Sequence, residues 1–597
     1  MKRTLALILA LVMTMALVAC GGDKATSSTP STPSTSTPGT TTPSTPTPGT
    51  TTEPSKPAEP TLTKAEQLKK DNADKYGGEF NVIFGGTSPT MDFHSSNAGS
   101  LYVNRFALHI YENLLTADAN GKFYPCICDY EVSADGCTYK LTLQDRHFST
   151  GEKIEMEDIE ASLRRYVGMN YTTQSGYDKI FKGTTWKIEG DTITFQMESF
   201  NINFETMIKS ISGSFKIMPK EICEKWAPDW STGTYDPATD LTWGCTKVNE
   251  ITDVKDIIGS GPYCLESWMG ESEIVLVRNE NYEMIVEGNE DAIGAAAPRM
   301  AYADKIRFVV STDSATNTAA TLAGEFQLGS VQADMWDTAL AMGLKRWDAG
   351  TSWTHGIFFN LHESNADSPI ADVNVRKAIR AAIDPHATLL AILGTEERIT
   401  AEPEPYPVLK SNAYYSSNLW EEQGDYYQDL DKAKEYLAQS SYNGDPIVYL
   451  CHASGSFYKG AMAISPVLES IGLKVELMVV DNGSHTAMRK DYKTGYDIGG
   501  WEVQKNEENP VLHSTFVNGS VGWWKTPARE TTVNTMLAYP TGSPESIAAY
   551  QDYLQAVVDE CPYFLFGQAI SFLWTSSDYV KDMNGQTHYF WNSYFAK

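Results

Sequence analysis

Eight cysteines beyond residue 120 are the side chains of this 597-residue chain best suited to covalent cross-links or metal binding. Cys126 and Cys128, with Cys137 nearby, have the close spacing of a metal pair, but no histidine lies at ligand spacing. We therefore expect structural thiols there and no metal. Cys223 and Cys245 enclose a segment rich in Trp, Pro and Asp, and an even number of cysteines permits disulfides in an exported chain. These two are the best candidate pair for a disulfide.

Motifs for catalysis are missing from the sequence. It contains no GxSxG nucleophile elbow, no HExxH zinc motif and no GxxxxGK[ST] phosphate loop, and "HESNA" (362–366) lacks the second histidine. The ten histidines are scattered, and acid pairs such as Glu155 and Glu157 are common in a chain with 76 Asp and Glu residues. We therefore expect a protein that is not an enzyme and that has no cofactor.

Cys20 follows a predicted export signal. Two basic residues open the chain, and the apolar run over residues 5–18 is too short to span the ~30 Å core of a bilayer. The order Leu-Val-Ala-Cys-Gly (17–21) resembles the lipobox of bacterial lipoproteins, which are cleaved before the cysteine and lipidated on its sulfur. We predict a signal peptide over residues 1–19 and a lipid anchor on Cys20. The alternative is an ordinary secreted protein that is cleaved near Ala19.

The segment after Cys20 has the composition of a disordered tether. Residues 26–61 are almost entirely Thr, Ser, Pro and Gly, so they bury too little apolar surface to offset the entropy of ordering. Proline stiffens such a chain towards polyproline II at ~3.1 Å per residue, which gives a reach of roughly 100 Å. We predict that residues 20–75 link the anchor to a folded region. This arrangement resembles surface lipoproteins of Gram-positive bacteria.

The charge of the chain excludes some classes of partner. The formal net charge is −29 and the pI is about 4.7, so a basic footprint for nucleic acid is absent. An anionic membrane surface would repel such a domain rather than hold it. No later stretch is long and apolar enough for a transmembrane helix. Roughly 520 residues follow the tether, which is sufficient for two or three lobes with separate cores.

The first half of the folded region is predicted to be rich in β-structure. "CTYKLTLQ" (137–144) alternates as a strand does, and residues 185–197 and 261–279 have the pattern of hairpins, the first turning at Gly190. "MEDIEASLRRYV" (156–167) has apolar residues at helical spacing, with acids at its start that suit the helix dipole.

The second half alternates between helix and strand. Asp372 is expected to cap a helix over residues 373–383 that stops near Pro385. Beyond it we predict a βαβ unit with parallel strands, and then another helix and a strand. The unit and the last strand are expected over residues 447–452, 461–472, 474–480 and 496–501. Sheet-rich and alternating regions in one chain suggest lobes that face one another across a cleft.

A set of sequence blocks resembles the solute-binding lipoproteins of bacterial ABC importers, family 5, in the oligopeptide- and dipeptide-binding branch. The longest block is "HIYENLLTADANGKFYPCICDYEVSADGCTYKLTLQDRHFSTGEKIEMEDIEASLRR" (109–165). The blocks that follow in the family's order are "FKIMPKE" (215–221), "IIGSGPYCLESW" (257–268), "RNENY" (278–282), "DVNVRKAIRAAID" (372–384), "DLDKAKEYLA" (429–438) and "LESIGLKVE" (468–476). The resemblance covers most of the chain from residue 80 onward, and its specificity lies in the ordered set.

The resemblance implies an α/β protein with the large type II fold of periplasmic binding proteins. Two main lobes and an extra lobe would surround a hinged ligand cleft. By analogy, lobe I comprises residues 76–105, 215–352 and 565–597, the extra lobe residues 106–214, and lobe II residues 353–564. Closure about the hinge would then be driven by the contacts that a ligand makes only in the closed form.

The resemblance also places ligand contacts after the strand in "YDIGGWEVQKNEENP" (496–510). Peptide-binding members usually have an aspartate about three residues past the tryptophan, where it captures the α-ammonium of the peptide. Trp501 matches the tryptophan, but the aspartate position holds Gln504, and losing such a pair costs ~2–5 kcal/mol, at least tenfold in affinity. Either Glu502 or Glu507 supplies the charge from a shifted position, or the ligand has no amine there. The alternative is that both acids face solvent.

The resemblance also implies that two further segments and the aromatic residue Tyr177 contact the ligand. "GGTSPTMDF" (85–93) resembles the segment that lines the cleft, and "TSWTHGIFFN" (351–360) enters the second lobe near the expected crossover. For Trp353 and Tyr177, packing in a core is an equally good expectation. The candidate ligand-binding residues are Gly86, Thr87, Ser88, Tyr177, Trp353, Thr354, His355, Trp501, Glu502 and Gln504.

We therefore expect an extracellular, lipid-anchored and monomeric binding protein that delivers a small ligand to the permease and ATPase subunits of an ABC importer. The expected ligand is a peptide. An oligosaccharide is the alternative, because some relatives bind sugars and Gln504 removes the amine anchor. A sensory or adhesive lipoprotein on the same fold is a third option.

Overall fold

The computed structural model describes the chain from residue 62 to residue 594 with several gaps. The predicted signal peptide, Cys20 and most of the predicted tether lie outside the described residues. The end of the predicted tether is described and is not disordered, because α2 (Lys64–Asp71) lies within it and packs Ala65 and Leu68 against a buried cluster. The residues left out are 1–61, 85–89, 96–100, 119–121, 171–179, 182, 210–214, 228–235, 237–242, 246, 271, 293, 312, 402–413, 415–418, 420–423, 425, 454, 505–521, 577–589 and 595–597.

A four-stranded sheet is built from segments far apart in the sequence. Its order is β1 (Glu79–Phe84), β10 (Lys305–Val310), β9 (Glu273–Arg278) and β8 (Tyr263–Met269), with β1 and β10 parallel and the other neighbours antiparallel. The β8–β9 pair confirms the hairpin predicted over residues 261–279. Helix α3 (Leu101–Ile110) packs on β8, and Phe106, Phe308 and Trp591 are buried together in this core.

A second four-stranded sheet is antiparallel throughout. Its order is β4 (Cys128–Val132), β5 (Thr138–Leu143), β7 (Thr192–Met197) and β6 (Thr184–Glu189). The predicted strand and the hairpin at Gly190, which has a φ of 60°, are confirmed. Helix α4 (Met156–Asn170), also predicted, and α6 (Ile202–Lys209) belong to the same part of the chain, where β2 (Leu115–Ala117) pairs with β3 (Phe123–Pro125).

The third and largest sheet has six strands. Their order is β12 (Ile399–Ala401), β16 (Tyr563–Ser576), β11 (Leu344–Phe359), β15 (Ile498–Gln504), β13 (Pro446–His452) and β14 (Lys474–Val480). β13 is parallel to both β14 and β15, whereas β11 is antiparallel to its two neighbours. Helix α14 (Gly455–Ser470) connects β13 to β14 and contains Pro466, so the predicted βαβ unit is confirmed. The helix begins six residues earlier than predicted.

Helix boundaries in this part follow capping chemistry. Helix α10 (Val373–Ala382) begins after Asp372, whose side chain accepts a 2.8 Å hydrogen bond from the backbone N–H of Asn374, as predicted. Pro385 opens the next helix, α11 (Pro385–Leu393), where its missing N–H has no intrahelical partner to lose. The remaining helices are α2 (Lys64–Asp71), α7 (Lys220–Lys225), α8 (Ser314–Leu322), α9 (Trp336–Ala341), α13 (Leu430–Ala438), α15 (Asn482–Lys490), α17 (Pro527–Ala538) and α18 (Pro544–Glu560).

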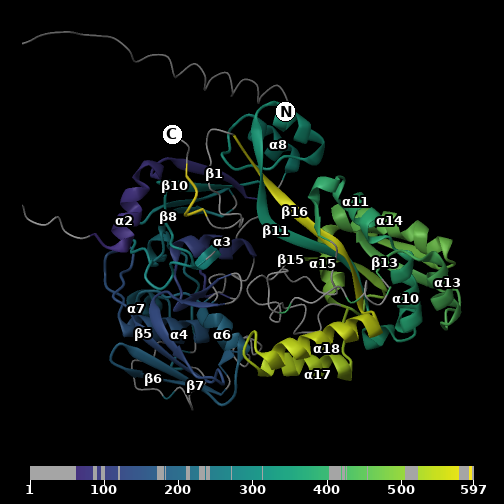
Figure 1. Cartoon of the computed structure of the whole chain (residues 1–597), viewed down its shortest axis with the longest axis horizontal. Helices are drawn as coiled ribbons and strands as arrows, with labels where there is room; N and C mark the ends of the chain where they lie inside the picture. Colours follow the sequence, from purple (N-terminus) through teal and green to yellow (C-terminus); the bar gives the residue numbers. More distant parts are fainter. Residues whose placement is uncertain are drawn as a thin grey trace, which may run out of the picture. The chain divides into compact units, whose positions relative to one another are not determined.

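Each of the three larger sheets has its own cluster of buried hydrophobic residues. The long strands β11 and β16 pair side by side, as Figure 1 shows. The boundaries predicted between lobes I and II, at residues 352/353 and 564/565, both fall inside these two strands. Two continuous strands therefore carry the chain across the predicted boundaries, and the lobe limits themselves stay a prediction.

The disulfide predicted between Cys223 and Cys245 is not formed, because the two buried thiols pack at different points along α4. The sulfur of Cys223 lies 4.0 Å from the hydroxyl of Ser162, whereas Cys245 packs against Gly168. Six residues of helix correspond to ~9 Å, and a disulfide needs Cα atoms within about 7 Å.

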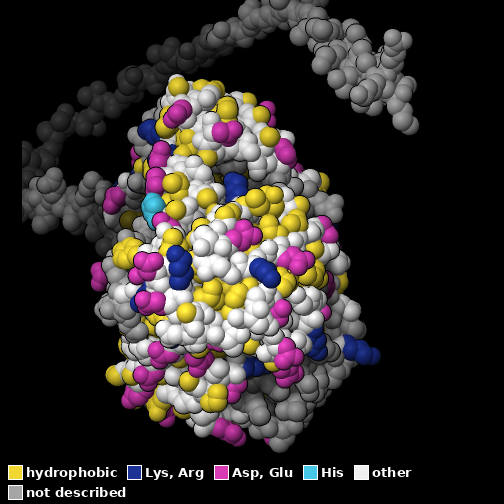
Figure 2. Space-filling view, turned by 90° about the vertical axis from the view of Figure 1, so that its right-hand side faces the viewer, with side chains coloured by type: hydrophobic (Ala, Val, Ile, Leu, Met, Phe, Trp, Pro, Cys, Tyr) yellow, Lys and Arg dark blue, Asp and Glu magenta, His cyan; other side chains and the backbone are white. Residues whose placement is uncertain are grey.

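Among the described side chains, no basic patch is seen on the face that carries α10, α11, α13 and α14. In Figure 2, Asp and Glu side chains are spread over it among hydrophobic ones, and Lys and Arg are sparse. Within the described residues, no helix combines the length and hydropathy that crossing a membrane requires.

Candidate functional site

The six-stranded sheet brings several predicted site residues to one edge. The parallel strands β13 and β15 end at His452 and Gln504, so their carboxyl ends lie at the same edge, where ligands commonly bind in α/β sheets. β11 runs the opposite way and pairs Trp353 with Gln504 and His355 with Glu502. Residues far apart in the sequence are thereby placed opposite one another on adjacent strands.

Glu502 is an ionised carboxylate held in a partly buried place. Its Oε1 lies 3.4 Å from His355 Nδ1, and its side chain is 28% exposed. Burial pushes the pKa of the Glu502 carboxyl upward, but hydrogen bonds from His355 and Ser456 and the charge of Arg489 outweigh it and leave the pKa below its usual value. Arg398 is also close enough to feel the Glu502 charge, although burial lowers the pKa of its guanidinium.

The opposite face of these strands is packed into the core. Successive strand residues point to opposite faces, so Trp501 lies on the other side of the sheet from Glu502. The indole of Trp501 packs edge-to-face on Tyr563 with ring centroids 5.0 Å apart. Thr354 is buried on that side, and Trp353 is half-buried on the Glu502 side. A ligand contact by Trp501 or Thr354 stays a prediction.

A histidine pair lies beside this edge, and sequence reasoning missed it. His452 closes β13, and His485 comes from α15; their rings meet edge-to-face with centroids 4.0 Å apart. Phe457, at the start of α14, stacks on His485 at 5.2 Å. One helical turn beyond His485, the guanidinium of Arg489 lies 5.8 Å from the Phe457 ring centre. A Cβ on Gly500 would collide with Phe457, so glycine there lets α14 approach β15.

Both histidines are neutral at pH 7. Burial lowers the pKa of His485 to about 4, with further lowering by His452 and Arg489, and burial and Arg489 lower the pKa of His452. The Nε2 atoms of both rings are buried and have no hydrogen-bond partner among the described residues. The histidine pair thus holds two buried ring nitrogens without a hydrogen-bond partner among the described residues, and His452 lies close enough to Glu502 for its charge to act on the ring.

This arrangement suits binding more than catalysis. It combines a carboxylate, two arginines and two neutral imidazoles, which can pair with the charged and polar groups of a ligand. Within the described part of the chain, no three His, Cys, Asp or Glu side chains are placed to hold a metal ion.

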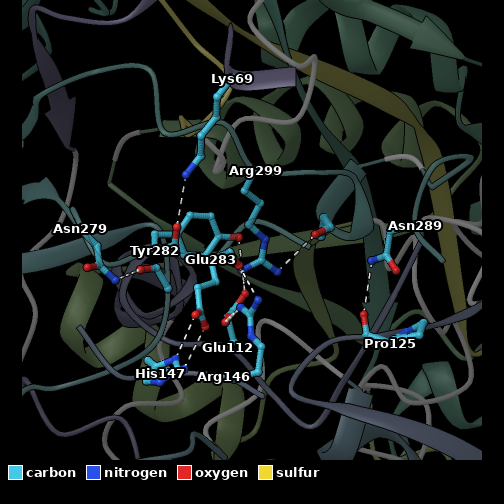
Figure 3. A network of polar contacts seen from close by, with 12 residues as sticks. Lys69, Glu112, Pro125, Arg146, His147, Asn279, Tyr282, Glu283, Asn289 and Arg299 are labelled. Carbon is cyan, nitrogen blue, oxygen red and sulfur yellow. Dashed lines mark hydrogen bonds and ion pairs between the residues drawn. The ribbon is translucent and has the colours of Figure 1, made fainter. Parts of the chain in front are cut away.

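A second polar network, shown in Figure 3, pairs its charged groups within the protein, although Arg146 Nε and Arg299 Nη1 have no hydrogen-bond partner among the described residues. The fully buried carboxylate of Glu112 follows α3 and accepts a 2.6 Å ion-pair contact from Arg146, and Arg299 approaches it to 3.9 Å. The hydroxyl of Tyr282 donates to the same carboxylate at 3.5 Å. The network joins the end of α3 to the loops around residues 145 and 282, so its evident role is to hold these segments together.

Several predicted residues lie outside the described part of the chain, so their role stays a prediction. They are Cys20, Gly86, Thr87, Ser88, Tyr177 and Glu507, and the side chain of Gln504 is likewise not described.

His452 was missed, although the predicted strands were sufficient to place it at this edge of the sheet. The sequence predicted a parallel strand ending at His452 and another ending near residue 501, and the carboxyl ends of parallel strands share an edge. His485 and Arg489 lie on a helix whose packing face the sequence did not define.

Solved structures of solute-binding proteins share this fold. The chain is similar to the periplasmic binding protein DppA of Helicobacter pylori in complex with the peptide STSA, at 17% identity and a TM-score of 0.66, with 88% of this chain and 100% of that chain covered. AppA of Bacillus subtilis, in complex with a nonapeptide, matches at 16% identity and a TM-score of 0.62, covering 88% and 100%. AgaA of A. tumefaciens R10, in complex with agropinic acid, matches at 17% identity and a TM-score of 0.62, with 87% of this chain and 99% of that chain covered.

These likenesses show the two-lobe, mixed α/β type II fold of periplasmic binding proteins, as the sequence predicted. The family model for bacterial extracellular solute-binding proteins, family 5, matches residues 122–523, which is more than half of the chain. Proteins of this family bind small solutes for ABC importers and are not enzymes. The chain belongs to the bacterial extracellular solute-binding proteins of family 5.

Proposed function

We propose that this protein captures a peptide outside the cell and delivers it to the permease and ATPase subunits of an ABC importer. The observation that carries the peptide assignment is the ionised carboxylate of Glu502. It lies at the edge of the large sheet where β13 and β15 end, two residues before Gln504. A carboxylate here can take the α-ammonium that a neutral amide at position 504 cannot hold by charge.

The proposed action is hinge closure. Lobe I (76–105, 215–352 and 565–597) with the extra lobe (106–214) would close on lobe II (353–564), with β11 and β16 as the connections between them. A ligand favours the closed form only through contacts that it makes better there than in the open form. Glu502, on lobe II, contributes one such contact when the ligand also touches lobe I.

We further propose that the mature chain is a monomer anchored by lipid on Cys20, on the outer face of a Gram-positive cytoplasmic membrane. The support is the lipobox-like order at residues 17–21 and the Thr, Ser, Pro and Gly composition of residues 26–61. Intact mass of the membrane-extracted protein tests this: a diacylglycerol on Cys20 and loss of residues 1–19 are expected, and an unmodified sulfur would contradict the anchor.

An oligosaccharide is the second candidate, and Gln504 is the residue that favours it, because an amide can hydrogen-bond sugar hydroxyls. AgaA, which is in complex with agropinic acid, is a neighbour of the same fold with a ligand other than a peptide.

Thermal melting with a mixed peptide pool and, separately, an oligosaccharide pool distinguishes the two. A ligand at 100 times its Kd adds about 2.7 kcal/mol of stability, which raises the melting temperature. We expect a rise with peptides alone. A rise with sugars alone would overturn the peptide assignment and leave the binding role intact.

A further inference from the structure

The histidine pair, His452 and His485, needs an explanation beyond packing. His485 is 1% exposed, yet its Nε2 and that of His452 have no hydrogen-bond partner among the described residues. Buried polar atoms are nearly always paired, because each unpaired one keeps the full penalty of losing water. Phe457 stacks on His485, and phenylalanine in place of either histidine would give similar contacts without that penalty.

The charges around the histidine pair are of both signs. Arg489 lies one turn from His485 on α15 and disfavours protonation of both imidazoles, so its positive potential reaches them. Glu502 on β15 acts on His452 in the opposite sense. The Glu502 charge is itself engaged by hydrogen bonds from His355 on β11 and from Ser456 on α14, and it also acts on Arg398.

Neutral imidazoles beside a guanidinium are suited to an anionic oxygen. Each ring can carry its proton on Nε2 and donate it, while Arg489 supplies the positive charge. An ammonium group would be repelled by Arg489 and is better placed on Glu502.

We propose that His452, His485 and Arg489 form a subsite that binds a carboxylate of the ligand. The inference rests on the proposed peptide function and narrows it: the preferred peptides carry an acidic group close to the amino group that Glu502 holds. The carboxylate would accept hydrogen bonds from both Nε2–H groups and a charge-assisted bond from Arg489. No bond is made or broken, and the peptide leaves unchanged.

The test compares carboxylates with their amide counterparts in peptides of equal length. Calorimetric titration of the full chain would use Glu-Ala-Ala, Gln-Ala-Ala and the C-terminal amide of Gln-Ala-Ala. In the natural protein we expect at least a tenfold loss of affinity from Glu-Ala-Ala to Gln-Ala-Ala, in which the side-chain carboxylate becomes an amide. In His485→Phe and Arg489→Met the loss should fall below about threefold, which corresponds to the missing charge-assisted bonds. A loss confined to the C-terminal amide would place the recognised carboxylate at the other end of the peptide and overturn the subsite.

Two further variants separate a ligand contact from a structural role. His386→Phe on α11 is the matched control, because this histidine is exposed and contacts Glu396. It should discriminate as the natural protein does. His485→Gln keeps an N–H donor, so it should retain discrimination.

The pH dependence gives a second readout. A bound anion favours protonated imidazole, so affinity for Glu-Ala-Ala should rise as pH falls from 7 to 5 in the natural protein and less so in His485→Gln.

Each outcome decides the matter. If acid and amide peptides bind the natural protein equally, the subsite is overturned and peptide capture stands. Unchanged discrimination in both Arg489→Met and His485→Phe overturns it as well, and if His485→Phe fails to fold, Arg489→Met and His485→Gln decide. If no peptide binds, the peptide function fails and this inference fails with it.

Discussion

The network around Glu112 and the cluster around Glu502 are both partly or fully buried polar groups, but they differ in how their members are paired. Glu112 is enclosed by Arg146 and Arg299, and its carboxylate accepts a hydrogen bond from Tyr282. Arg146 Nε and Arg299 Nη1 have no hydrogen-bond partner among the described residues, but both guanidinium groups face the Glu112 carboxylate. In the histidine pair near Glu502, the two Nε2 atoms without a described partner belong to neutral rings instead.

The difference teaches which buried polar groups serve the fold. A charge that is paired inside the protein holds segments together, and removing one partner exposes the desolvation cost of the other. A neutral ring nitrogen that is buried without a partner lowers stability, and in the histidine pair, which lies beside the carboxyl ends of β13 and β15, we attribute its retention to a group that arrives from outside.

The largest effect is expected from breaking the Glu112 network. Glu112→Gln removes the negative charge that faces Arg146 and Arg299, and we expect a loss of ~3–5 kcal/mol in the free energy of unfolding. Denaturant titration measures it. Glu131→Gln is the control, because its pair with Lys140 is exposed and should contribute at most ~1 kcal/mol. Equal losses in the two variants would show that the Glu112 network is not structural.

Glu502→Gln should have the opposite profile. We expect a loss of ~2–5 kcal/mol in peptide binding, which is more than tenfold in Kd, because the ligand ammonium loses its charge-assisted partner. Calorimetric titration measures the loss. Glu476→Gln, an exposed acid on β14 of the same sheet, should bind as the natural protein does. Unaltered peptide affinity in Glu502→Gln would place the ammonium elsewhere.

Local patterns carried most of the fold. The hairpins at residues 185–197 and 261–279, the Asp372 cap and the parallel βαβ unit are all confirmed, because alternation, turn residues and caps are local properties. The paired strands β11 and β16 lie some two hundred residues apart in sequence, and no local pattern indicates their pairing.

The candidate site was predictable only in part. Family resemblance led to His355 and Glu502, and the structure places them on adjacent strands. His485 was missed because its role depends on which face α15 turns towards β13, which is a tertiary property. The prediction of a disulfide between Cys223 and Cys245 was wrong for the same reason, because spacing along the chain does not indicate where each thiol lies in the fold.

Acidification should destabilise the protein through two buried histidines, His94, which contacts the backbone of Lys216, and His485 of the histidine pair. Burial lowers the pKa of His94 to about 3 and that of His485 to about 4, against 6.5 in the unfolded chain. Between these values and 6.5 the unfolded state binds more protons, so stability falls as pH drops, by at most ~1.4 kcal/mol per pH unit for each histidine. His485→Phe should remove the part of this stability loss that His485 causes between pH 6.5 and 4. Denaturant titration at several pH values measures it. Parallel curves for the two proteins would mean that His485 is not held neutral.

The smallest effect is the most diagnostic. At pH 7, His485→Phe should change the free energy of unfolding by no more than ~1 kcal/mol, and the change should be neutral or stabilising, because it removes an unpaired nitrogen and keeps a ring against Phe457. His485→Ala is the companion variant: it removes the nitrogen too but leaves a cavity, so it should be less stable than His485→Phe. Melting of both without ligand measures this. A clear loss in His485→Phe would mean that the ring nitrogen is engaged within the fold, and the contrast between the two regions would then disappear.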